Sequence, residues 1–100
     1  MNWATHAIET LQRGQNAQIR PRGHSMSGKI NNGQLVTLQP YKGEGPLPVG
    51  TIVLVNVKGR VFLHLIKAVN GPRYLIGNNR GGTNGWVRGH AIYGIVTKVE

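Results

Sequence analysis

Both serines of this protein lie within ten residues near its start, RPRGHSMSGK (20–29). The chain contains no aspartate, no cysteine and three glutamates, so a pair of catalytic carboxylates or a thiol nucleophile has few or no residues to supply it. A serine hydroxyl becomes a nucleophile when a neighbouring base takes its proton. Ser25 and Ser27 stand between Gly23 and Gly28, in a segment where a turn would expose a side chain to a substrate. The sequence therefore favours a serine nucleophile whose base comes from elsewhere.

Two residues are candidate bases for Ser25. Lys29 is close in sequence, but a solvated lysine in so basic a segment stays protonated unless it is buried. His64 stands inside VFLHLIKAV (61–69), where the two-residue period of a strand puts it on the face of Phe62 and Ile66. A histidine there is either a core residue bonded to a carbonyl or a base whose geometry a rigid strand fixes.

Other chemistries have weaker support. The four histidines show no metal-ligand spacing, and the Gly- and Asn-rich segment 77–85 lacks the pattern of a phosphate-binding loop. We expect no metal and no cofactor.

Twelve Lys and Arg residues against three acidic ones give a net charge of +9. Such a balance fits nucleic-acid binding through counterion release, and it equally fits a basic solvated surface without a specific site. The residues that would contact phosphates are Arg20, Arg22, Lys29, Arg80 and Arg88.

The elements that must position these residues are mainly strands. Residues 1–14 are expected to form a unit with one amphipathic helix (2–12), whose apolar side chains pack on the domain or contact a partner. Residues 15–100 are expected to form a single β domain, because Val, Ile, Leu, Thr and Tyr recur with a period of two between Gly, Pro and Asn turns. The predicted strands are 17–20, 34–39, 51–57, 61–69, 73–77 and 91–99, with a tight turn at Lys58-Gly59 and irregular connections at 40–50 and 77–85.

No apolar run approaches the roughly 20 residues that cross a bilayer. No secretory leader opens the chain, and cysteine is absent. We therefore expect a soluble cytoplasmic protein without a membrane partner.

Five segments in order resemble the S24/S26 serine peptidase superfamily, which contains the self-cleaving SOS and phage repressors and the type I signal peptidases. They are GHSM (23–26), INNGQLVTL (30–38), LPVGTIVLVNVKGRVFLHLIKAV (47–69), YLIGNN (74–79) and IYGIV (92–96). The resemblance covers about residues 17–98 and implies a mainly-β fold of coiled antiparallel sheets.

The resemblance also implies roles for residues. Ser25 would be the nucleophile, Met26 and Gly23 would shape the substrate cleft, and His64 would replace the lysine base that most members carry. Imidazole suits this role because it titrates near neutral pH. Lys67 is not expected to be the base, because it lies on the opposite face of its strand.

This sequence departs from the family at every aspartate: Gln34, Thr51 and Asn78 stand in the corresponding boxes. Losing the carboxylate of a hydrolytic triad can cost a factor on the order of 10⁴ in rate. Asn78 or Asn79 is expected to orient the imidazole instead. The cations Arg22, His24 and Lys29 are expected to lower the pKa of His64 and so keep it neutral.

Two functions from different classes follow. One is peptide-bond hydrolysis by a Ser25–His64 dyad, either as self-cleavage or on a peptide or protein substrate laid along a sheet edge. The other is an inactive peptidase-like scaffold that binds nucleic acid or protein, and a regulatory homodimer formed through the C-terminal strand is a third hypothesis.

Overall fold

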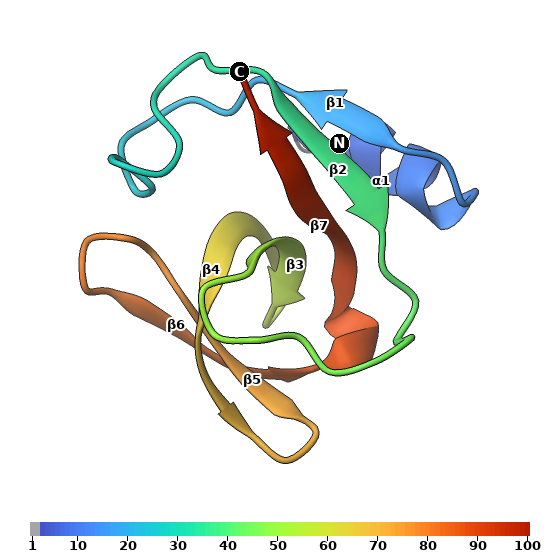
Figure 1. Ribbon diagram of the computed structural model, residues 1–100, viewed down its shortest axis with the longest axis vertical. Coiled ribbons are helices and arrows are strands. Elements are labelled where there is room, and N and C mark those ends of the chain that lie inside the picture. Colours follow the sequence, from blue (N-terminus) through green and yellow to red (C-terminus); the bar gives the residue numbers. More distant parts are fainter. Residues whose placement is uncertain (1–2) are drawn as a thin grey trace.

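The computed structural model describes residues 3–100, so Met1 and Asn2 of the predicted N-terminal unit lie outside the described residues. Seven strands form one antiparallel sheet with the order β1-β2-β7-β3-β4-β5-β6, and the sheet curls into a half-barrel (Figure 1). The elements are α1 (Thr5–Gln12), β1 (Ala17–Ile19), β2 (Val36–Pro40), β3 (Ile52–Val57), β4 (Arg60–Asn70), β5 (Arg73–Gly77), β6 (Thr83–Arg88), the 3-10 helix η1 (Gly89–Ala91) and β7 (Ile92–Val99). The predicted mainly-β class with one short helix is confirmed.

Four register shifts curl the sheet. They lie between β2 and β7, β3 and β7, β4 and β5, and β5 and β6. Each leaves one residue of a strand without a partner across the ladder, which bends that strand and increases its twist.

The core has two parts because β3 and β4 are buried on both faces. On one side Leu54, Leu63 and Leu65 pack with α1, which contributes Ala7 and Leu11. The other side has Val53, Val55 and Ile66 with residues of β5, β6 and β7. Burial on two faces explains why these strands appear in the sequence as nearly continuous apolar runs.

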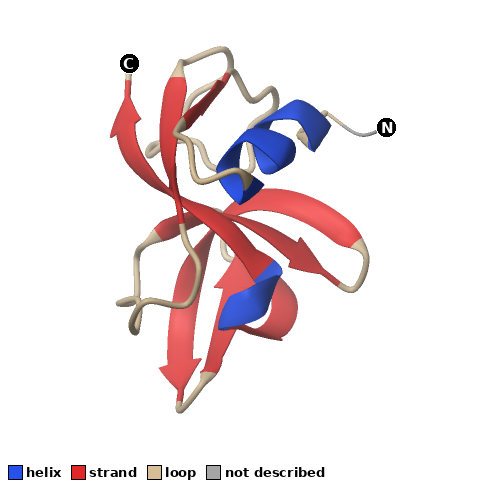
Figure 2. Cartoon of the chain, turned by 90° about the vertical axis from the view of Figure 1, so that its right-hand side faces the viewer, coloured by secondary structure: helices blue, strands red, loops and turns tan. Residues whose placement is uncertain are grey.

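The helix covers one end of the sheet (Figure 2). It begins at Thr5, later than predicted, and Trp3 precedes it with 54% of its surface exposed instead of joining the apolar stripe. Ala7 and Leu11 are buried, so the packed arrangement is the one observed.

Three further predictions about elements can be compared with the structure. Lys58 and Gly59 both have positive φ, as a two-residue hairpin turn requires, and they join β3 to β4. Strand β6 was not predicted, because its residues were assigned to a loop or left unassigned. Strand β7 pairs with β2 and β3 inside the sheet, so the outer strands are β1 and β6 and not the C-terminal strand expected to support a dimer.

At Gly94 of β7 the Leu11 side chain of the helix lies close to the backbone of the strand. A Cβ at this position would lie 2.8 Å from the Gln39 carbonyl oxygen and 2.9 Å from Leu11 Cδ1. We expect Gly94→Ala to lower the free energy of unfolding by about 1–3 kcal/mol through overpacking, measured by urea denaturation. Gly45→Ala is the matched control, because nothing lies within 4 Å of its Cβ and its φ is not positive. Equal stability of the two variants would contradict this packing.

Candidate active site

Ser25 is exposed in a turn that also contains two buried side chains. Met26 and Ile30 are only 5% and 3% exposed and belong to the core beneath α1. The Ile30 amide donates a 2.8 Å hydrogen bond to the Met26 carbonyl, which closes the turn. Gly23 and Gly28 have φ of +107° and +93°, a backbone region that other residues rarely adopt. The turn thus anchors apolar side chains on one side and presents Ser25 on the other.

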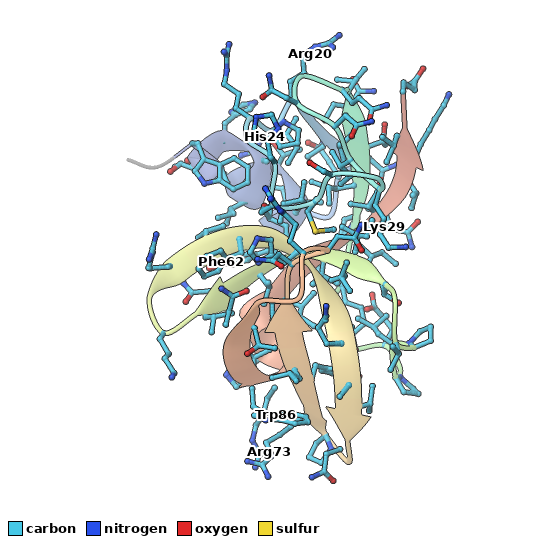
Figure 3. All side chains as sticks on the ribbon, turned by 90° about the vertical axis from the view of Figure 1, so that its left-hand side faces the viewer. Arg20, His24, Lys29, Phe62, Arg73 and Trp86 are labelled. Atoms are coloured by element: carbon cyan, nitrogen blue, oxygen red, sulfur yellow. The ribbon has the colours of Figure 1, made fainter. Side chains whose placement is uncertain are left out.

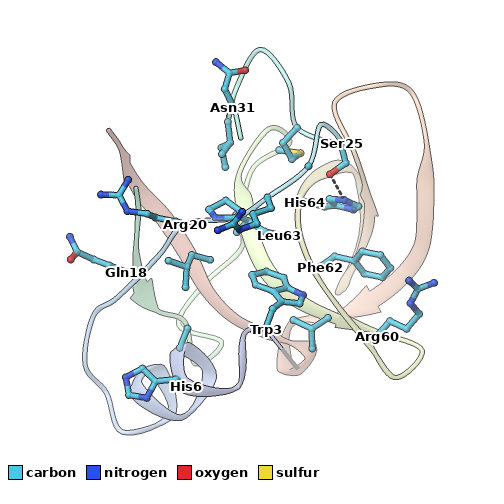
Figure 4. Close-up of a pocket in the computed structure, with 18 residues that line it drawn as sticks. Trp3, His6, Gln18, Arg20, Ser25, Asn31, Arg60, Phe62, Leu63 and His64 are labelled. Carbon is cyan, nitrogen blue, oxygen red and sulfur yellow. Dashed lines mark hydrogen bonds between the residues drawn. The ribbon is translucent and has the colours of Figure 1, made fainter. Parts of the chain in front are cut away.

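His64 lies beside Ser25 although the two are far apart in sequence. The His64 Nε2 to Ser25 Oγ distance is 3.2 Å (Figure 4). The ring is 7% exposed and stacks on Phe62 with 4.9 Å between ring centroids. Phe62 and Ile66 are in the core opposite Leu63 and Leu65, as the two-residue period predicts.

Asn84 of β6 contacts the other nitrogen of the ring. The distance from His64 Nδ1 to Asn84 Oδ1 is 2.7 Å. Since an amide oxygen only accepts hydrogen bonds, Nδ1 carries the proton and Nε2 is left to accept one from Ser25. Ser25, His64 and Asn84 therefore form a hydrogen-bonded chain with the polarity of a serine–histidine–acceptor triad.

A β-bulge directs Asn84 toward the ring. Gly77 pairs with Thr83 and Ile76 pairs with Gly85, so Asn84 is the extra residue of β6. A bulge re-aims a side chain that a regular strand would place elsewhere. Gly85, the residue after the bulge, has a φ of +142°, a backbone conformation that residues other than glycine rarely adopt.

The prediction that Asn78 or Asn79 orients the imidazole was wrong. Asn78 Oδ1 accepts from the amides of Arg80 and Gly82 and so closes the β5–β6 loop. Asn79 donates from its backbone N–H to the Ser25 carbonyl at 2.9 Å and from Nδ2 to the Ser27 carbonyl at 2.8 Å. Asn79 thereby connects the serine turn to the β5–β6 loop, and its recorded hydrogen bonds are to this turn and not to the His64 ring.

Neither lysine near the site serves as a partner for Ser25. Lys67 Nζ donates to the Asn78 carbonyl at 2.8 Å, and Lys67 is the unpaired residue of the β4 bulge. Lys29 is exposed on the serine turn, and Figure 3 shows it on the outside of the molecule.

Burial lowers the pKa of His64, because removal from water penalises the charged ring. The hydrogen bond to Asn84 acts in the opposite direction and raises it. Arg22, His24 and Lys29 are not among the causes, so the expected contribution of these cations is not seen. The net effect is still a neutral imidazole near pH 7, the state that a general base needs.

A cleft of about 700 Å³ opens next to Ser25 and His64. Its lining comes from residues 18–23, which include the end of β1, from residues 60–64 of β4, and from Trp3 and Ala7. Gly23 and Met26, the two residues expected at the substrate cleft, both line it.

The five cations expected to contact phosphates do not all line the cleft. Arg20 and Arg22 line the cleft, whereas Lys29, Arg80 and Arg88 do not. All five are exposed. Within residues 3–100 no group of three or more histidine and acidic side chains is placed to hold a metal ion, and no helix is long and apolar enough to cross a membrane.

No protein-family model, no curated protein and no solved structure matches this chain. The similarity to the S24/S26 peptidases stays a prediction from the residues.

The contact between Asn84 and His64 is tested by titrating the ring. We expect Asn84→Ala to lower the His64 pKa further, because an acceptor that stabilises the imidazolium is lost, and Asn84→Asp to raise it through the added charge. The measurement is the pH dependence of the His64 Cε1–H resonance by NMR, with exposed His6 as the internal control. An unchanged His64 pKa in Asn84→Ala would show that Asn84 is not the partner.

The lowered His64 pKa also links stability to pH. An unfolded histidine titrates near about pH 6.5, so below that value the unfolded chain binds a proton that the folded protein resists. Stability is then full above about pH 6.5 and falls as the pH drops through that value toward the folded pKa. Urea unfolding at neutral and mildly acidic pH should show this loss in the wild type and a smaller loss in His64→Gln. An equal loss in both would mean that other groups cause it.

Proposed function

We propose that the protein is a serine hydrolase that cuts peptide bonds, with Ser25 as nucleophile, His64 as general base and Asn84 as the residue that orients the base. The observation that carries the proposal is the hydrogen-bonded chain from Ser25 Oγ through both ring nitrogens of His64 to Asn84 Oδ1. Three segments distant in sequence contribute to it. The predicted similarity to serine peptidases gives independent support for the same serine and histidine.

The proton path follows from the tautomer. As Ser25 Oγ attacks the substrate carbonyl carbon, its proton passes to His64 Nε2, and Asn84 Oδ1 stabilises the resulting imidazolium through Nδ1–H. The imidazolium then gives its proton to the leaving amine, which breaks the peptide bond and leaves an acyl group on Ser25. Water, deprotonated by the same nitrogen, hydrolyses that ester and restores the serine.

The carbonyl oxygen of the substrate needs hydrogen-bond donors as it becomes negative. Among the described residues the backbone N–H of Ser25 donates to no acceptor, although the amides of residues 27–30 of the turn are bonded. This N–H is the donor that we assign to the oxyanion.

The cleft fits an extended peptide because two strand edges face it. Strand β1 is an outer strand that pairs with β2, and β4 pairs with β5 only from Leu65 onward. Residues 60–64 of β4 therefore have one edge without a strand partner. A peptide that adds to such an edge is held by main-chain hydrogen bonds.

Fluorophosphonate labelling tests the nucleophile. We expect the wild type to gain the probe on the peptide that contains Ser25, detected by mass spectrometry, and Ser25→Ala to remain unlabelled. Ser27→Ala is the matched control, since its hydroxyl donates to the His24 carbonyl and does not contact His64. Labelling that is equal in wild type and Ser25→Ala would sink the proposal.

The base and its partner have graded expected effects. His64→Ala should slow labelling by at least about 10³-fold, as loss of a triad base does. Asn84→Asp should accelerate it about tenfold, because a charged acceptor strengthens the hydrogen bond by about 1–1.5 kcal/mol. The rate should rise with pH through the His64 pKa and level off above it, and a rate independent of pH would contradict a histidine base.

A further inference from the structure

The cleft beside Ser25 carries positive charge with no acidic side chain to balance it. Its lining includes Arg20, Arg22 and Arg60 and contains no glutamate. None of the three glutamates lines the cleft: Glu9 is exposed on α1, Glu44 accepts a hydrogen bond from the Lys42 amide, and Glu100 pairs with Lys98 at 3.6 Å. A substrate in the cleft therefore meets a local positive potential, which favours anionic groups.

Arg60 is held in a defined position relative to His64. Its guanidinium carbon lies 5.4 Å from the centroid of the Phe62 ring, and Phe62 stacks on His64. The three residues alternate along β4, so their side chains share one face of the strand. A guanidinium stacked on an aromatic ring keeps its N–H donors at the edge, where they bind carboxylates in a bidentate manner.

The spacing along β4 translates into a spacing along the substrate. A peptide paired with residues 60–64 advances at the same rise as the strand, about 3.3 Å per residue, and its side chains alternate in the same way. The peptide residue opposite Arg60 is then four residues from the one opposite His64, and on the same face. The residue between these two on that face lies opposite Phe62, where an apolar side chain fits.

We propose that the cleft selects extended peptides that carry an acidic side chain four residues from the residue opposite His64, with Arg60 as its partner. The proposal rests on the proposed function, in that it takes the cleft as the peptide site. It adds a specificity determinant that is separate from the residues of the reaction.

The opposite wall strengthens the preference for acidic peptides. Arg20 follows β1 and lines the cleft (Figure 4). Its Nη1 donates to the Gly33 carbonyl at 2.9 Å, which fixes the side chain while leaving its other N–H donors available. An acidic residue near this wall would gain a second, weaker contact.

The test measures binding without turnover. Short fluorescein-labelled peptides rich in Val and Thr are titrated with Ser25→Ala and followed by anisotropy. They share a central Leu and differ in having Glu four residues before it, Glu four residues after it, or Gln at both positions. The direction in which the peptide lies along β4 decides which of the two Glu positions faces Arg60. The Glu peptide with that position should bind about 5- to 10-fold more tightly than the Gln peptide.

Variants of Arg60 connect the preference to this residue. In the Ser25→Ala background, Arg60→Gln should make the Glu and Gln peptides bind equally, and Arg60→Glu should favour a peptide with Lys at the same position. Arg73→Gln is the matched control, because this substitution removes the same charge from an exposed residue of β5 that does not line the cleft (Figure 3). It should leave the preference for Glu unchanged.

Equal binding of Glu and Gln peptides, or a preference that survives Arg60→Gln, would overturn the inference even if Ser25 is labelled by the fluorophosphonate. Displacement of the peptides by single-stranded DNA with an affinity above that of the Glu peptide would also overturn it, since the cleft would then bind a polyanion. No binding of any peptide together with an unlabelled Ser25 would overturn the proposed function as well.

Discussion

The hydrogen bond between His64 and Asn84 can form only where β6 departs from regular pairing. The ring belongs to β4, and β5 lies between β4 and β6 in the sheet. Side chains of a regularly paired β6 would stand perpendicular to the sheet beside those of β5 and would not point toward β4. The bulge at Asn84 and the positive φ of Gly85 direct one amide across that gap. The tautomer of His64, its orientation and the acceptor nitrogen offered to Ser25 all depend on this local irregularity.

In the proposed mechanism both hydrogen-bond partners of His64, Ser25 and Asn84, are uncharged. The acceptor function is retained because Asn84 presents oxygen to Nδ1. What is lost is the negative charge that would stabilise the imidazolium in the transition state, so the proposed reaction is slower than one with a carboxylate at this position. The residue that orients the base has no proton to gain or lose near neutral pH.

The three asparagines of the β5–β6 segment divide the work of assembling the site. Asn78 shapes the loop, Asn79 binds the serine turn, and Asn84 holds the imidazole. The same stretch of chain thus positions both Ser25 and His64, through Asn79 on the serine turn and through Asn84 on the imidazole ring. The stretch is therefore a single structural unit, although its residues make contacts of three different kinds.

Much of this arrangement could be predicted from the sequence, and the parts that could not have a common cause. Alternation in residues 61–66 places His64 correctly, and Gly23 and Gly28 mark the turn of Ser25, because these signals depend on local backbone preferences. Strand β6 was missed because Asn84-Gly85 has the composition of a turn, and the orienting asparagine was therefore sought closer to residue 77. The cause of the lowered His64 pKa was also misjudged, because burial of a side chain depends on tertiary packing that no local pattern records.

Because of the bulge, the proposed active site differs from a regularly paired sheet by one extra residue in β6. Removing Asn84 would let Thr83 and Gly85 continue the pairing with Gly77 and Ile76 without a break. The side chains before and after it would keep their faces, so both cores would remain intact. A chain shorter by this one residue would keep the pairing and lose the acceptor of the base, so under the proposed mechanism a single insertion, and not a substitution, separates a hydrolase from an inert binding scaffold.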